Sequence, residues 1–215
     1  MIIMKINKKF RQKVEKIIEL LDEFYPDTKC FLDYETPWQL LVATILSAQC
    51  TDQRVNIVTK DLFARYTHIN ELAAADVAEL EEIIKSTGLY HSKAKNIIAA
   101  AKLIQSDYGG EVPSGLEALT KLPGVGRKTA NIVRGHIFGI PSIAVDTHVK
   151  RVSFRLGLTK NTDPDKVELD LMDVLPEHYW IKYNNRIIAH GRAVCKARSP
   201  SCGGCCLNML CLRKM

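Results

Sequence analysis

The clustering of cysteines is the sequence feature that most constrains how this chain can fold. Five of the seven cysteines lie near the C-terminal end, from Cys195 onward. Four of them follow the spacing Cys195-x6-Cys202-x2-Cys205-x5-Cys211. Thiolates spaced this closely can wrap one compact site, and such a site fixes the path of the loop around it. The sequence therefore predicts a metal or cluster site at the C-terminal end.

Two features predict a cytoplasmic protein without a membrane span. The chain begins MIIMKINKKFRQ, where only a very short apolar run precedes the first Lys, unlike a secretory signal. The longest stretch without a charged residue, 36–51, contains Gln and Ser, so it is too short and too polar to cross a bilayer. Disulfides are rare in the cytoplasm, which favours a ligand role for the clustered cysteines.

Positive charge is concentrated in two parts of the chain. Residues 121–160 hold eight Lys and Arg against one acidic residue, and residues 179–215 hold seven and no acidic residue. Because the net charge is only +6, the remaining chain is acidic. Basic stretches are often solvated helix faces, but two on an otherwise acidic chain favour a polyanionic partner, since phosphates release counterions to Lys and Arg.

Apolar periodicity predicts an all-α fold. From Val14 onward, apolar residues recur at the i, i+3, i+4, i+7 spacing of one buried helical stripe. No stretch shows sustained strand alternation between turn signals. We expect helices over residues 13–24, 38–48, 77–84, 92–105, 116–120, 127–139, 146–157, 165–174 and 179–194.

The run LPGVGRKTAN, residues 122–131, predicts two short helices joined by a tight glycine hairpin. Gly124 and Gly126 permit backbone conformations that other residues avoid and allow a ligand to approach closely. Free amides at the start of the next helix favour an anion. No Walker Lys-Ser/Thr pair follows the glycines at the required spacing, which favours a nucleic-acid backbone over a nucleotide. A turn whose glycines serve packing alone is the alternative.

The longer run LPGVGRKTANIV resembles the helix-hairpin-helix hairpin of the endonuclease III branch of the DNA glycosylases. Three further stretches match that branch: AVDTHVKR, the cysteine tail, and ILSAQCTDQRVN with TGLYHSKAKNI. The resemblance implies two helical domains that flank a DNA-binding cleft. These would be a continuous domain of residues 30–140, with the helix-hairpin-helix at about 115–139, and a discontinuous domain of residues 1–29 plus 141–215, with an iron–sulfur loop at 195–211.

Lys128 and Asp146 correspond by this resemblance to the catalytic Lys and Asp of the family. A neutral Lys can attack the deoxyribose C1′ as the base departs, which gives a Schiff base and allows β-elimination of the 3′ phosphate. A carboxylate can stabilise positive charge on the sugar and assist proton transfers. Taken singly, Lys128 could instead be a surface phosphate contact and Asp146 a helix N-cap.

The resemblance also implies a [4Fe–4S] cluster with Cys195, Cys202, Cys205 and Cys211 as ligands, and zinc is the alternative. Cys206 is an extra thiol next to Cys205, so a register shift of one residue is conceivable. Gln49 would enter the space left by a flipped-out nucleotide, and Leu89 would wedge beside the opposite base, although a core role is the alternative for Leu89. The other implied DNA contacts are Gly124, Val125, Gly126, Arg127, Lys196 and Arg198.

Together these features predict a bifunctional DNA glycosylase and AP lyase of base excision repair that removes oxidised pyrimidines. Its expected partner is double-stranded DNA containing damaged bases or abasic sites, and we expect a monomer with no membrane association. The resemblance implies a bacterial-type, nucleoid-associated location in the cytoplasm. The alternatives are a helix-hairpin-helix protein that only binds DNA and a mismatch-specific glycosylase of the same superfamily.

Overall fold

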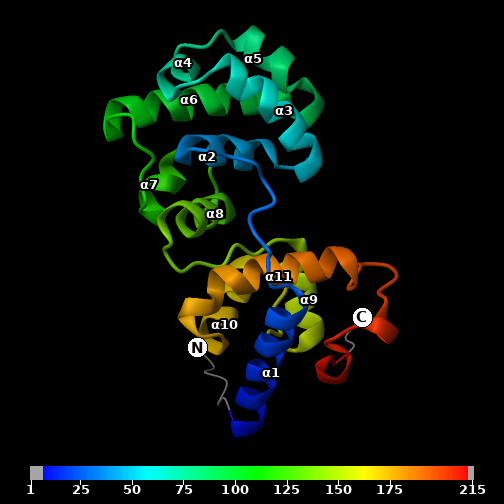
Figure 1. Cartoon of the computed structure of the whole chain (residues 1–215). Coiled ribbons are helices and arrows are strands. Elements are labelled where there is room, and N and C mark those ends of the chain that lie inside the picture. Colours follow the sequence, from blue (N-terminus) through cyan, green and yellow to red (C-terminus); the bar gives the residue numbers. More distant parts are fainter. Residues whose placement is uncertain (1–6, 213–215) are drawn as a thin grey trace. The chain divides into compact units, whose positions relative to one another are not determined.

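The computed structural model describes residues 7–212, and within them it contains helices and loops but no strand (Figure 1). The chain divides into a continuous unit, Cys30–Ile140, and a discontinuous unit made of Met1–Lys29 and Pro141–Met215. Each unit has its own apolar core. The all-α fold predicted from the periodicity is confirmed.

Helix α2 forms the centre of the continuous unit. It is apolar on almost every side, and every residue from Trp38 to Leu46 is buried. It packs against α3, α6 and α8, while α6 also packs against α4 and α5. The helices of this unit are α2 (Pro37–Leu46), α3 (Asp52–Arg65), α4 (Ile69–Ala73), α5 (Val77–Ile84), α6 (Tyr90–Tyr108), α7 (Leu116–Lys121) and α8 (Arg127–Phe138), with a 3-10 turn, Lys85–Thr87, before α6.

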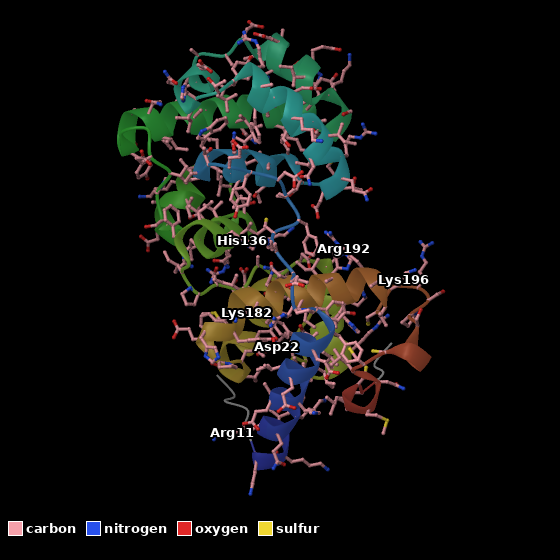
Figure 2. The ribbon with its side chains drawn as sticks, in the orientation of Figure 1. Arg11, Asp22, His136, Lys182, Arg192 and Lys196 are labelled. Atoms are coloured by element: carbon pink, nitrogen blue, oxygen red, sulfur yellow. The ribbon has the colours of Figure 1, made fainter. Side chains whose placement is uncertain are left out.

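The discontinuous unit is built around α11, which packs against α1 and α9. At the crossing with α9, a Cβ on Gly191 would lie only 3.0 Å from Nδ1 of His148, so the close approach favours glycine. On α1, Asp22, which is labelled in Figure 2, accepts a 2.6 Å hydrogen bond from the Tyr179 hydroxyl and pairs with Arg186. The helices are α1 (Lys8–Phe24), α9 (Thr147–Leu156), α10 (Pro164–Val174) and α11 (Trp180–Ala193), and two 3-10 turns, Cys202–Gly204 and Asn208–Leu210, follow them.

Two helices, α3 and α4, were not expected from the sequence. The buried stripe of α3 includes Thr59 among its apolar residues, which weakens the apolar pattern. Helix α4 is a short segment, Ile69–Ala73, and cannot repeat a helical period. Helix α1 also begins earlier than expected, because the Asn7 side chain caps it by accepting from the Phe10 amide at 2.8 Å.

No helix within residues 7–212 is long and apolar enough to cross a membrane. The cytoplasmic location stays a prediction.

Candidate functional site

The glycine hairpin, residues 122–126, joins α7 to α8 in the continuous unit. Gly124 has a φ of 80°, a conformation that selects glycine, and a Cβ at this position would also lie in tight contact, 3.0 Å, with Cβ of Asn96 on α6. Val125 donates its amide to the Leu122 carbonyl at 3.1 Å and buries its side chain. The amide and the side chain of Val125 are therefore both engaged within the protein.

Helix α8 begins at this hairpin without a side-chain cap. Gly126 is the N-cap and has no side chain to accept from the first-turn amides. Within residues 7–212, neither Gly124 nor Gly126 donates its amide to a backbone carbonyl, and both residues are exposed. This arrangement presents several N–H groups at the positive end of a helix dipole, which is a suitable geometry for a phosphate.

Lys128 is the second residue of α8, and its side chain is exposed. Arg127, which precedes it, is also exposed. An amine at this position lies within the first helical turn after the hairpin, so a DNA backbone held by the hairpin amides would be close to it.

Asp146 is the N-cap of α9 in the discontinuous unit. Its Oδ1 accepts from the Val149 amide at 2.7 Å, and the residue is half-buried. The capping role that the sequence left open is therefore present. It uses one carboxylate oxygen, and a carboxylate has further lone pairs that can stabilise a developing positive charge.

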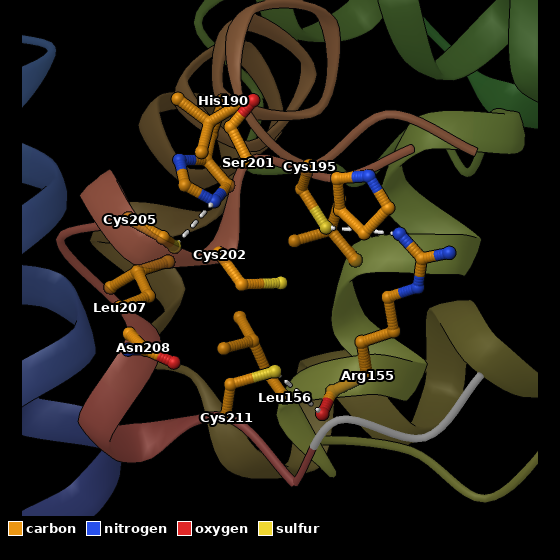
Figure 3. Close-up of a pocket in the computed structure, with 13 residues that line it drawn as sticks. Arg155, Leu156, His190, Cys195, Ser201, Cys202, Cys205, Leu207, Asn208 and Cys211 are labelled. Atoms are coloured by element: carbon orange, nitrogen blue, oxygen red, sulfur yellow. Dashed lines mark hydrogen bonds between the residues drawn. The ribbon is translucent and has the colours of Figure 1, made fainter. Parts of the chain in front are cut away.

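The cysteine loop, residues 195–211, surrounds a cavity of about 60 Å³. Its lining includes Cys195, Cys202, Cys205 and Cys211, but Cys206 is not among the lining residues (Figure 3). A single water needs roughly 10–15 Å³ by the same kind of measure, so the cavity has room for a larger group. Most of the other lining residues are apolar: Val152, Leu156, Val194, Pro200 and Leu207.

The thiols around this cavity influence one another. Burial raises the pKa of the Cys205 thiol more than any other effect does. The negative charges of the Cys195, Cys211 and Cys202 thiolates raise it further. Thiolates crowded in this way repel unless a cationic centre neutralises them. No three His, Cys, Asp or Glu side chains in the described part of the chain are arranged to hold one metal ion, and the cysteines instead line the wall of a shared cavity.

Arg155 anchors the cysteine loop. The residue is 8% exposed, and its guanidinium donates to the Cys195 sulfur at 3.3 Å and to the carbonyls of Lys196 and Ala197 at 2.8 and 3.0 Å. Arg151 adds a bond of 2.9 Å to the Cys195 carbonyl. Both arginines belong to the basic stretch of residues 121–160, and nothing in the local sequence pattern distinguishes a buried arginine from a solvated one.

His190 also contacts the cavity. It is almost fully buried, and its Nε2 lies 3.5 Å from the Cys205 sulfur while its Nδ1 lies 2.9 Å from the Tyr25 hydroxyl. Burial lowers the pKa of His190 to about 4. The ring is therefore neutral at pH 7 and adds no positive charge to the cavity.

Gln49 and Leu89 are the two non-glycine residues within residues 7–212 that have a positive φ, 54° and 51°. Both side chains are exposed, and Leu89 is 56% exposed, so the core role considered for Leu89 is excluded. Leu89 immediately precedes α6, and Gln49 lies between α2 and α3. Strained backbone at exposed side chains is typical of functional sites.

Lys196 and Arg198 lie at the start of the cysteine loop, and both are exposed. Figure 2 shows Lys196 where the chain leaves α11. The Arg155 bond to the Lys196 carbonyl fixes the backbone from which the Lys196 side chain projects. Both side chains are therefore available for contact with phosphates.

The chain is similar in sequence to known DNA repair proteins. Residues 42–177 match the HhH-GPD superfamily of base excision DNA repair proteins. Endonuclease III of Synechocystis is 55% identical over 94% of this chain and 92% of its own, and endonuclease III of Bacillus subtilis is 48% identical over 93% and 92%.

Solved structures show the same similarity. A trapped covalent intermediate of endonuclease III with DNA matches with a TM-score of 0.90 and 45% identity, over 94% of this chain and 96% of that one. A non-covalent endonuclease III–DNA complex matches equally well, over 94% and 95%. The chain therefore belongs to the endonuclease III family, within the HhH-GPD superfamily of base excision DNA repair proteins.

Proposed function

We propose that this chain is a bifunctional DNA glycosylase and AP lyase that acts on oxidised pyrimidines in double-stranded DNA. The observation that carries the proposal is the exposed Lys128, placed in the first turn of an uncapped helix directly after the glycine hairpin. The hairpin amides bind a phosphate and so bring the sugar of a flipped nucleotide to the amine. The covalent endonuclease III–DNA intermediate of the similar solved structure supports a covalent route.

In this mechanism the neutral amine of Lys128 attacks C1′, and the bond from C1′ to the base breaks with its electron pair leaving on the base. The leaving base takes up a proton, and loss of the amine proton and ring opening give an imine between Lys128 and C1′. Abstraction of a C2′ proton then expels the 3′ phosphate by β-elimination. Asp146 stabilises the positive charge that grows on the sugar and assists these proton transfers.

The decisive experiment uses duplexes that carry one defined lesion, such as thymine glycol, and measures base release, strand cleavage and trapping by borohydride. We expect all three with the lesion and none with an intact thymine. A duplex with a G·T mismatch tests the mismatch-specific alternative. Binding without base release from any duplex would contradict the proposal and favour a protein that only binds DNA.

We also propose that Cys195, Cys202, Cys205 and Cys211 hold a [4Fe–4S] cluster. The donor set fits, because four thiols line one cavity with room for a compact group, and Cys206 lies outside the lining. When bound, the cluster would cross-link the four cysteines and so hold the loop in one conformation. Arg155 donates a hydrogen bond to the Cys195 sulfur, and the loop presents Lys196 and Arg198 to phosphates.

The purified protein is expected to be brown and to contain about four irons per chain. Cys195→Ser, Cys202→Ser and Cys211→Ser should each lose iron, because each removes a thiol from the cavity. Cys206→Ser is the matched control and should keep it. Elemental analysis measures the iron content, and the visible spectrum measures the colour. A colourless protein with one zinc would contradict the cluster.

DNA binding is expected to weaken steeply with salt, since log K falls by about 0.9 per neutralised phosphate in duplex DNA. Removing Lys196 or Arg198 should flatten that slope by up to about one unit each, equally for damaged and intact DNA. Titrations at several salt concentrations measure the slope. An unchanged slope in both variants would show that these side chains do not contact phosphates.

Within this proposal the protein works as a monomer on chromosomal DNA in a bacterial-type cytoplasm.

A further inference from the structure

Gln49 and Leu89 lie in two turns that are far apart in the sequence, and one side chain connects these turns. Lys93 on α6 is 4% exposed. Its ammonium donates to the Leu46 carbonyl and to the Thr87 carbonyl, both at 2.8 Å. Leu46 ends the helix just before the Gln49 turn, and Thr87 ends the 3-10 turn just before Leu89.

Each turn is further held by its own hydrogen bonds. In the first, the Cys50 amide donates to the Ser47 carbonyl at 3.1 Å, which brackets Gln49. In the second, the amide of Lys93 donates to the Leu89 carbonyl at 3.0 Å, so the backbone and the side chain of Lys93 hold the two ends of the Leu89 turn. Hydrogen bonds from Lys93 therefore hold both of the turns that contain a non-glycine residue with positive φ.

Burial of a cation at this position is costly, and burial lowers the pKa of Lys93. Leu46 is the last residue of α2, where the helix dipole concentrates partial negative charge, so a cation is favourable at that carbonyl. An apolar residue would fill the same space without joining the two turns. The arrangement therefore indicates that the role of the buried Lys93 amine is to join the Gln49 turn to the Leu89 turn.

We propose that Lys93 is a positioning residue that holds the Gln49 and Leu89 turns at a fixed separation, so that both side chains enter the duplex together when a nucleotide is flipped out. This inference rests on the proposed glycosylase function. The vacated space in a duplex is about one base in size, so two side chains can fill it only if their turns keep their separation. Lys93 itself touches neither the DNA nor the reacting atoms.

The test compares Lys93→Met, which removes the cation, with Lys93→Arg, which can still donate to both carbonyls. Single-turnover excision of thymine glycol and the fluorescence of a base analogue beside the lesion are measured. We expect Lys93→Met to lose about tenfold or more in both, since a displacement of about 1 Å can cost up to a hundredfold. Lys93→Arg should recover most of the loss. The salt slope of binding to intact DNA should not change.

Loss of stability needs its own control. Ile104→Val, at a buried position further along α6, should lower the melting temperature without affecting flipping or excision. If Lys93→Met does not fold, Lys93→Gln carries the same comparison, because its amide removes the positive charge and keeps two N–H donors. Adding Lys93→Met to a Gln49→Ala/Leu89→Ala protein should cost little more, because the residues that it positions are already gone.

Three outcomes would overturn the inference: wild-type flipping and excision in folded Lys93→Met, an equal loss in Ile104→Val at matched stability, or a fully additive effect in the combined variant. If the wild type itself neither flips nor excises the lesion, the proposed function falls and this inference falls with it. If the wild type and Lys93→Met are equally active, the proposed function stands and only the role inferred for Lys93 is rejected.

Discussion

Lys128→Gln is expected to abolish covalent trapping on lesion DNA by borohydride while leaving DNA binding intact. Reduction traps the protein only through an imine, and Gln has no amine to form one. The side chain of Lys128 is exposed at the start of α8, so its replacement disturbs no packing and the melting temperature should barely change. Denaturing gels of borohydride-treated complexes measure trapping, and fluorescence anisotropy measures binding.

Lys121→Gln is the matched control, because Lys121 is an exposed lysine at the end of α7, next to the same hairpin. It removes the same charge but should keep trapping and base release. Lys128→Arg should lose trapping although it keeps the charge. Trapping that persists in Lys128→Gln would assign the nucleophile to another residue and remove the proposed mechanism.

Asp146→Asn is expected to slow turnover by more than about a hundredfold, the order expected for losing a placed charge or an acid–base group. Asn caps helices about as well as Asp, so the bond from the Val149 amide should survive and the melting temperature should change little. Asp146→Ala removes the cap as well, and should cost about 1 kcal/mol of stability in addition. Single-turnover excision and thermal unfolding separate the two effects.

Asp163→Asn provides the control for a capping aspartate without a catalytic role. Asp163 caps α10 by accepting from the Lys166 amide at 3.1 Å. Its replacement should leave excision at the wild-type rate. If Asp146→Asn behaves like Asp163→Asn, capping is the whole role of Asp146.

Local sequence patterns were sufficient for most of the fold. The helices with clear apolar stripes, the Asp76 cap of α5 and the break at Gly109 all depend on residues within a few positions of one another. The glycine hairpin is local too, because the φ of Gly124 and the missing cap at Gly126 follow from glycine itself. Where the local signal was weak, at α3 and α4, the prediction failed.

By itself, the sequence determined which residue types are available: four spaced thiols, an amine after a glycine hairpin, a carboxylate at a helix start. Only the tertiary structure decided that Cys205 and not Cys206 lines the cavity, and that Arg155 holds the loop from another helix. It also placed the buried Lys93 amine between two strained turns. Burial and hydrogen bonding between distant segments produce these features, because the same Lys or Arg is a solvated charge or a buried anchor depending on which carbonyls the fold brings to it.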